Sequence, residues 1–155
     1  MKILIIGATG TVGKAVSAAL ASHELIRAGR SSGDHQVDIT DDASVTALFE
    51  RVGRVDAIVS ATGQMHFGPL AEMSAAQFDI GLQHKLLGQV RVALIGQRYL
   101  NAGGSITLTG GIVAHEPIRN GANASSVNAA LEGFVRGAAI ELANGSRINV
   151  ISRPC

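Results

Sequence analysis

"KILIIGATGTVG", residues 2–13, decides the fold of this chain. Its aliphatic run stops at a glycine, which is typical of a buried parallel strand. Three regularly spaced glycines then lead into a helical pattern. One permits a tight turn, a second lets the backbone approach a pyrophosphate, and the third allows close packing of helix on strand. Free amides at the helix N-terminus would hold the anion. The residues expected at the phosphates are Gly7, Thr9, Gly10, Thr11, Val12 and Gly13.

Beyond this unit, apolar strand-like runs alternate with helical patterns. Further strands are expected at 24–29, 36–39, 55–62, 104–110 and 147–152, and helices at 11–22, 41–52, 74–100 and 124–143. Only a short polar loop separates the second and third strands, so the helix of that crossover is expected to be short or missing. The alternation predicts an α/β, Rossmann-type doubly wound parallel sheet with strand order 3-2-1-4-5-6, in a single domain of residues 1–155.

Composition limits the function classes. A chain of 155 residues can bury roughly 70% of its unfolded surface. Charged residues make up 16% and the net charge is +1, which gives no electrostatic reason to expect nucleic acid or an acidic membrane as partner. The single cysteine, Cys155, excludes an internal disulfide and suits a reducing compartment. The apolar start is too short for a membrane span. We therefore expect a cytoplasmic protein, and we expect no metal site.

The Gly-x-x-Gly-x-x-Gly spacing resembles that of the short-chain dehydrogenase/reductase family, and the resemblance covers essentially the whole chain. It continues in "VDIT" (37–40), "SATG" (60–63), "NAALEGFVRGAAIEL" (128–142) and "RINVIS" (147–152). The resemblance implies that "VDIT" contacts the adenine and that "SATG" stands in place of the family's Asn-Ala-Gly. The residues it adds to the nucleotide site are Asp38, Ile39, Ala61, Thr62 and Gly63.

The choice of nucleotide can be argued from charge. An acid at the end of the second strand would bind a ribose 2′-hydroxyl and repel a 2′-phosphate. This chain has Arg30 there, followed by Ser31 and Ser32. A guanidinium suits a phosphate, and hydroxyls add donors. NADP is therefore the expected cofactor over NAD, the alternative being that Arg30 is a solvated loop residue.

The catalytic residues implied by the resemblance are missing. In the family, a tyrosine exchanges the proton at the substrate carbonyl, a lysine four residues later lowers its pKa, a serine polarises the substrate, and an asparagine organises a water. Here Asn128 stands at the lysine position and Ala124 at the tyrosine position. Gly110 or Gly111 replaces the serine, and Lys85 stands at the asparagine position. In divergent family members that this chain resembles more closely, the missing tyrosine and lysine are typical.

Two residues are candidates to take over the chemistry. Thr109 adjoins the serine position and can donate a hydrogen bond, while Lys85 can enter the nicotinamide side of the pocket. The alternative is that Lys85 is a helix residue whose side chain lies in solvent. Tyr99, the one tyrosine, lies far along the chain from the site and is expected to be a packing residue. Other polar residues near these positions are Ser125, Ser126, His115 and Glu116. The alternative for His115 and Glu116 is that they lie on an exposed loop and take no part in the chemistry.

Family members continue beyond "RINVIS" with substrate-binding helices and a seventh strand, which is absent from this sequence. The expectation is a truncated product or a sheet completed by a partner subunit. Small residues on the last helix suit homo-oligomer contacts through the fourth and fifth helices, as the resemblance implies, although the same face can pack on its own sheet. Two hypotheses follow: an atypical NADP(H)-dependent oxidoreductase acting on a small molecule, or a non-catalytic module that senses NADP(H) or binds partners.

Overall fold

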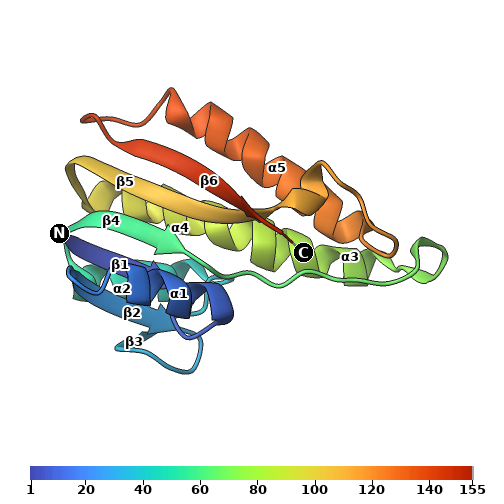
Figure 1. The fold of residues 1–155 in the computed structure, drawn as a ribbon, viewed down its shortest axis with the longest axis horizontal. Helices are drawn as coiled ribbons and strands as arrows, with labels where there is room; N and C mark the ends of the chain where they lie inside the picture. Colours follow the sequence, from blue (N-terminus) through green and yellow to red (C-terminus); the bar gives the residue numbers. More distant parts are fainter. Residues whose placement is uncertain (155) are drawn as a thin grey trace.

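The computed structural model describes residues 1–154, which build a six-stranded parallel sheet with helices on both faces (Figure 1). The order β3-β2-β1-β4-β5-β6 is the order that the sequence predicts. The strands are β1 Lys2–Ile6, β2 Glu24–Gly29, β3 His35–Gln36, β4 Val55–Ser60, β5 Leu100–Gly111 and β6 Arg147–Arg153. The main helices are α1 Thr11–Ala19, α2 Asp42–Val52, α3 Ala75–Gly81, α4 Gln89–Gly96 and α5 Ala122–Ala139. Short helical turns are η1 Leu70–Glu72, η2 Leu82–Gly88, η3 Gln97–Tyr99 and η4 Ile112–Ala114.

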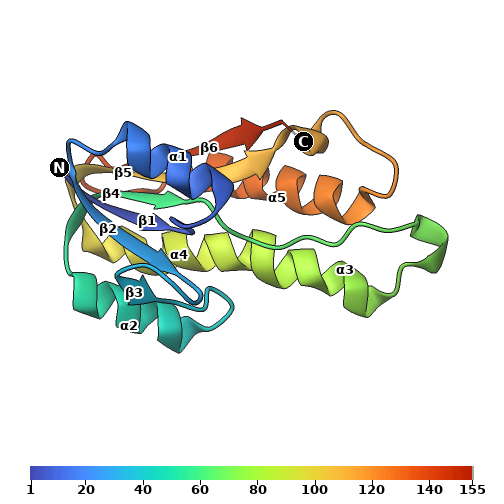
Figure 2. The ribbon, with the colours of Figure 1, turned by 60° about the horizontal axis from the view of Figure 1, so that its bottom comes forward.

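The central strand β1 is buried on both faces, which is why its sequence is continuously apolar. Leu4 and Ile6 join the core formed with α2, α4 and α5, whereas Ile3 and Ile5 pack towards α1. Figure 2 shows α1 on one side of the sheet and α2 and α4 on the other. Because all strands are parallel, their carboxyl ends meet at one edge, and the loops and α3 gather beyond that edge (Figure 1).

The third strand is shorter than predicted. The expected strand at 36–39 is wrong in extent, because only His35 and Gln36 pair with β2. Asp38 instead turns the chain: its carboxylate accepts hydrogen bonds from the backbone and side chain of Thr40. The missing crossover helix between β2 and β3 is confirmed, since residues 30–34 form only a bend.

The long helix predicted over 74–100 begins as expected, with Ser74 as its N-cap in a capping box with Gln77. It is then interrupted by the wide π turn η2 and ends before Leu100, which belongs to β5. The π turn rotates the helix relative to a regular 3.6-residue pattern. As a result the apolar stripe at 78, 82, 86, 90 and 94 does not form the buried face, and Leu94 is 49% exposed.

The buried residues of this helix are mostly small or polar. They are Gly81, Lys85, Gly88, Gln89, Val92, Ala93 and Gly96. A methyl group on Gly96 would lie 2.7 Å from the Phe49 ring, so the glycine lets α4 approach α2. The amide of Gln89 bonds both the N–H and the C=O of Thr109, which holds the helix to β5.

Candidate functional site

The glycine loop has the close approaches that its spacing predicts. Gly7 has φ +83°, and a Cβ there would lie 2.5 Å from the Ala61 carbonyl oxygen. A Cβ on Gly13 would lie 2.0 Å from the Gly7 oxygen, so this glycine is required where α1 packs on the loop. Gly10 differs, since a Cβ there would meet only the Gly7 oxygen, at 3.5 Å. Its outer side is therefore open for a ligand. Thr9 and Thr11 are exposed beside it, and Val12 is half-buried.

A cavity of about 200 Å³ lies beside this loop at the carboxyl edge of the sheet. Its lining residues are Ile6, Gly7, Gly29, Arg30, Val37, Asp38, Ile39, Thr62, Gly63, Gln64 and His84. The structure thus brings together residues from the glycine loop, the turn after β2, the 37–39 segment and the loop after β4. Ala61 lies next to the lining residues and is half-buried. We call this the nucleotide cavity.

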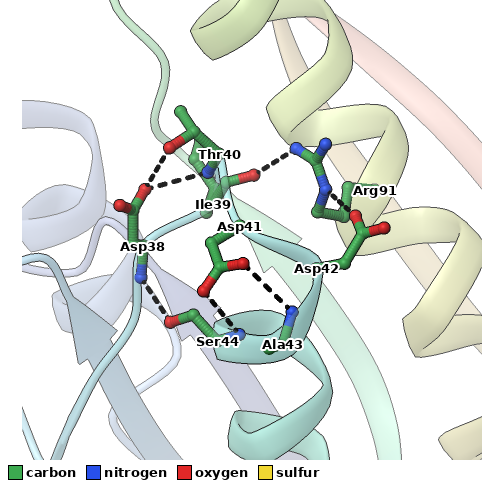
Figure 3. A network of polar contacts seen from close by, with 8 residues as sticks. All are labelled: Asp38, Ile39, Thr40, Asp41, Asp42, Ala43, Ser44 and Arg91. Carbon is green, nitrogen blue, oxygen red and sulfur yellow. Dashed lines mark hydrogen bonds and ion pairs between the residues drawn. The ribbon is translucent and has the colours of Figure 1, made fainter.

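The segment that leads from the nucleotide cavity into α2 is held by a polar network (Figure 3). Hydrogen bonds from Thr40, together with the nearby Arg30 and His84, hold the pKa of the Asp38 carboxyl below its usual value, so this acid is ionised at neutral pH. Arg91 of α4 donates to the Ile39 carbonyl oxygen over 2.6 Å and pairs with Asp42. A ligand would meet a fixed segment here.

The three residues after β2 take different places. Arg30 is exposed and lines the nucleotide cavity. The Ser32 hydroxyl lies 2.9 Å from that of Thr9 and joins this turn to the glycine loop. Ser31 is exposed and makes no side-chain hydrogen bond within residues 1–154. A cation and hydroxyls therefore lie together in the turn after β2, and such groups are donors of the kind that bind anions.

A second cavity, of about 310 Å³, lies at the same edge of the sheet between α5 and the π turn η2 that leads into α4. We call it the α4–α5 cavity. Its lining residues are Met65, Phe67, Lys85, Gly110, Gly111, Val113, Ile118, Asn128, Arg153 and Pro154. Lys85 comes from the π turn and is only 6% exposed. Burial, and secondarily the nearby Arg153 guanidinium, lower the pKa of Lys85 to about 8.

Most of the residues at the implied catalytic positions line the α4–α5 cavity, with Ala124 as the exception. Asn128 is fully buried, and its Nδ2 donates to the Ala124 carbonyl oxygen and to the sulfur of Met65. Ala124 offers no titratable group. Lys85 and Asn128 line the same cavity, so lysine and asparagine have exchanged the places that the resemblance gives them.

The second catalytic candidate, Thr109, has its hydroxyl engaged elsewhere. It is 4% exposed, and its Oγ1 donates to the Ser60 carbonyl oxygen over 2.7 Å. This bond joins β5 to β4 and uses the only hydroxyl hydrogen of Thr109, so the hydroxyl has no hydrogen left to donate to a ligand. Of the two candidates, Lys85 is the one that lines the α4–α5 cavity.

The loop residues serve local structure. The exposed His115 ring pairs with Glu132 of α5 over 2.8 Å, and Glu116 is exposed on the same loop. The Ser125 hydroxyl donates to the Val113 carbonyl oxygen, and Ser126 donates within its own helix. Tyr99 is half-buried and stacks on Phe49 with ring centroids 5.3 Å apart, as a packing residue should.

Several site residues escaped sequence reasoning. His84 and Gln64 line the nucleotide cavity but stand just outside the motifs that carry the family resemblance. Asn123 is fully buried, accepts from the His66 N–H and donates to the Phe78 carbonyl oxygen. It thereby joins the 63–69 loop to α3. The sequence carries no signal for this role, because the contact with Gly81, where a Cβ would lie 2.3 Å from the Asn123 Oδ1, is visible only in the structure.

None of the helices in residues 1–154 is long and apolar enough to cross a membrane. Within the same residues, no three His, Cys, Asp or Glu side chains lie together in a way that could hold a metal ion.

The six-stranded order, the glycine loop and the nucleotide cavity define a Rossmann domain of the kind that binds NAD(P). Residues 11–154 match a family model described as enoyl-(acyl carrier protein) reductase. The chain belongs to the short-chain dehydrogenase/reductase family.

Individual relatives agree with this assignment. Tetrahydroxynaphthalene reductase PfmaG from Pestalotiopsis fici is 33% identical over 87% of this chain and 52% of its own length. The protein lin1944 from Listeria innocua is 48% identical, with a TM-score of 0.98 over 99% of this chain and 78% of its own. A small-chain dehydrogenase solved in complex with NADPH is 32% identical, with a TM-score of 0.90 over 98% of this chain and 69% of its own. The chain spans about half the length of the curated relatives it matches.

Proposed function

We propose that the protein is an atypical NADP(H)-dependent oxidoreductase that acts on a small carbonyl compound in the cytoplasm. The observation that carries this proposal is that the two cavities adjoin. Gly63 lines the nucleotide cavity, and a Cβ on it would lie 2.7 Å from the Lys85 Cα, beside the α4–α5 cavity. A dinucleotide held by the glycine loop would therefore lead towards Lys85. When bound, NADPH would supply the hydride.

The chain's own residues suit the cofactor. The open side of Gly10 and the amides at the α1 N-terminus would hold the pyrophosphate. Asp38 and Ile39 would face the adenine. Arg30 would bind a 2′-phosphate, which supports NADP over NAD. The relative solved with NADPH is consistent with this choice.

The relatives also suggest a substrate class. Two of them are named as reductases of hydroxynaphthalenes, PfmaG and arp2 of Aspergillus fumigatus. The α4–α5 cavity is lined mainly by apolar side chains, which suits an aromatic or similarly apolar carbonyl compound.

A second function, cofactor sensing without turnover, is favoured by one observation. Ala124 and Asn128 carry no titratable group at the two positions where the family's acid–base pair stands. A module of this kind would bind NADPH and change its association with partners without consuming the nucleotide.

Titration of the protein with NADPH and NADH tests the proposal. We expect NADPH to bind more tightly than NADH, and Arg30→Ala to weaken NADPH binding by about tenfold through loss of a charge-assisted contact. Arg27→Ala is the matched control, because Arg27 is an exposed arginine on β2, just before Arg30, and does not line the cavity. Binding of neither nucleotide would refute the proposal. Binding without oxidation of NADPH by any carbonyl compound in a broad panel would favour the sensor.

A homo-oligomer through α4 and α5 is also proposed. An apolar groove of about 290 Å³ lies between these helices, lined in part by Leu94, Gly137 and Leu142. Its small and apolar residues suit close packing with a second copy. Leu94→Glu should shift the sedimentation coefficient to that of a monomer. An unchanged value, or a native protein that is already monomeric, would contradict this assembly.

A further inference from the structure

The α4–α5 cavity holds positive charge without a balancing acid. Lys85 and Arg153 both line it, and none of its described lining residues is acidic. No ion pair and no side-chain hydrogen bond between residues 1–154 involves the Lys85 amine. A nearly buried amine of this kind loses hydration without gaining a partner from its own chain. An oxygen-bearing ligand in the cavity would supply that partner.

A second polar atom in the same cavity lacks a partner. Asn128 is fully buried, and its Oδ1 accepts no hydrogen bond from any described residue. The orientation of the amide is fixed, because Nδ2 donates to the Ala124 carbonyl oxygen over 2.8 Å. Turning the amide over would place two acceptor oxygens against each other. The free atom is thus an acceptor, and it would bind a hydroxyl or N–H group of a ligand.

The remaining lining of the cavity is apolar. Met65, Phe67, Val113 and Ile118 surround the two polar positions, and Phe67 and Ile118 are exposed at the rim. Such a lining favours a ligand that buries apolar surface in the cavity. The ligand that satisfies the whole cavity is mainly apolar and carries one strongly accepting oxygen and one donor.

We propose that Lys85 and Asn128 form a two-point recognition site for hydroxylated aromatic carbonyl compounds. Lys85 Nζ donates to the carbonyl oxygen, and Asn128 Oδ1 accepts from a ring hydroxyl. This inference deepens the proposed oxidoreductase function and rests on it. In it Lys85 is a catalytic residue in place of the family's tyrosine, and Asn128 determines specificity.

The chemistry balances with the groups named. Reduction of the carbonyl forms a C–H bond at carbon and an O–H bond at oxygen, and it breaks the C=O π bond. The proton at oxygen comes from the Lys85 ammonium, which regains a proton from water. The hydride and its electron pair come from NADPH, which becomes NADP⁺. A lysine whose pKa is lowered by burial towards neutrality is a better proton donor than an ordinary lysine.

The first test uses 3-hydroxybenzoate and benzoate as probes, without nucleotide. Their carboxylate stands in for the oxygen on which negative charge develops, and only the first probe carries the hydroxyl. We expect Lys85→Met to weaken binding of both by about tenfold or more, as measured by calorimetry. Asn128→Leu should abolish the preference for 3-hydroxybenzoate while leaving benzoate binding unchanged. Lys14→Met, on the exposed face of α1, should bind both probes as the native protein does.

A second measurement needs no substitution at the site. The pKa of the Lys85 ammonium, followed by nitrogen NMR of labelled lysine, should rise when 3-hydroxybenzoate is bound. An unchanged pKa, or equal binding of the probes to Lys85→Met and the native protein, would overturn the inference. The two proposals fail separately. Lack of NADPH binding refutes the proposed function. Lack of probe binding by a protein that binds NADPH refutes only the two-point recognition by Lys85 and Asn128.

Discussion

The nucleotide cavity and the α4–α5 cavity lie at the same edge of one sheet, yet they differ in what builds them. The first lies beside a loop whose course is set by close backbone approaches, with glycines at 7, 10, 13 and 63 where the chain must approach itself or leave space for a ligand. The polar groups of the second are side chains from two helical segments, Lys85 of η2 and Asn128 of α5, which are more than forty positions apart in sequence. Where the backbone must approach closely, only glycine fits. Where side chains supply the polar groups, other side chains can replace them.

The comparison predicts its largest effect at Gly13. In Gly13→Ala a methyl group would lie 2.0 Å from the Gly7 oxygen and 2.6 Å from the Ala8 Cα, both backbone atoms that have no room to move. We expect a loss of about 4 kcal/mol in the free energy of unfolding, measured by urea denaturation.

Gly10→Ala is the matched substitution. Its methyl group would make only an ordinary contact, so stability should fall by no more than about 1 kcal/mol. NADPH binding should nevertheless be lost, since the methyl group would occupy the open side of the loop. If Gly10→Ala bound NADPH as the native protein does, the loop would not be the phosphate site.

The next effect belongs to the α4–α5 cavity and depends on pH. Burial sets the pKa of Lys85 to about 8 in the folded state, against 10.5 when exposed. Below pH 8 both states are protonated, and the folded state bears the full penalty of a buried charge. Between pH 8 and about 10.5 the unfolded state binds more protons, so stability rises with pH and the penalty disappears.

The penalty amounts to about 3 kcal/mol at neutral pH, at 1.36 kcal/mol for each pKa unit. Lys85→Met should therefore be more stable than the native protein at pH 7, and the difference should shrink by pH 10. Thermal unfolding at the two pH values measures it. Equal stability of Lys85→Met and the native protein at pH 7 would mean that water solvates the Lys85 charge. The α4–α5 cavity would then not bury an unpaired charge.

Asn123 connects the two regions, since its amide ties the loop after β4 to α3 and α5. Asn123→Ala should lower the free energy of unfolding by about 2 kcal/mol, because the His66 N–H and the Phe78 carbonyl oxygen lose their partner. Asn149→Ala, at an exposed position on β6, should have little effect. A loss in Asn123→Ala no larger than in Asn149→Ala would show that water replaces the amide and that the loop is held by other contacts.

The same difference explains how much could be predicted from sequence. The strand order and the glycine loop were predictable, because buried parallel strands and close backbone approaches each demand particular residues. The third strand was not, since the bonds of Asp38 to Thr40 end it early. Nor was the buried face of the long helix, because one extra residue in the turn at 82–88 changes which side faces the sheet. Asn123 was missed because a single asparagine in a helix carries no pattern.

The smallest predicted effect is the loss of a helix N-cap, which should change NADPH binding at only one of two helices. The Asp41 carboxylate accepts from the Ala43 and Ser44 N–H groups, and the Ser74 hydroxyl accepts from the Gln77 N–H. Asp41→Ala and Ser74→Ala should each cost about 1 kcal/mol of stability. Only Asp41 directly follows the segment that lines the nucleotide cavity, so Asp41→Ala alone should also weaken NADPH binding, by a few-fold. Equal NADPH affinity in the two variants would mean that the bonds from Arg91 and Thr40 hold that segment without the cap, and that the nucleotide cavity depends on α4 through Arg91.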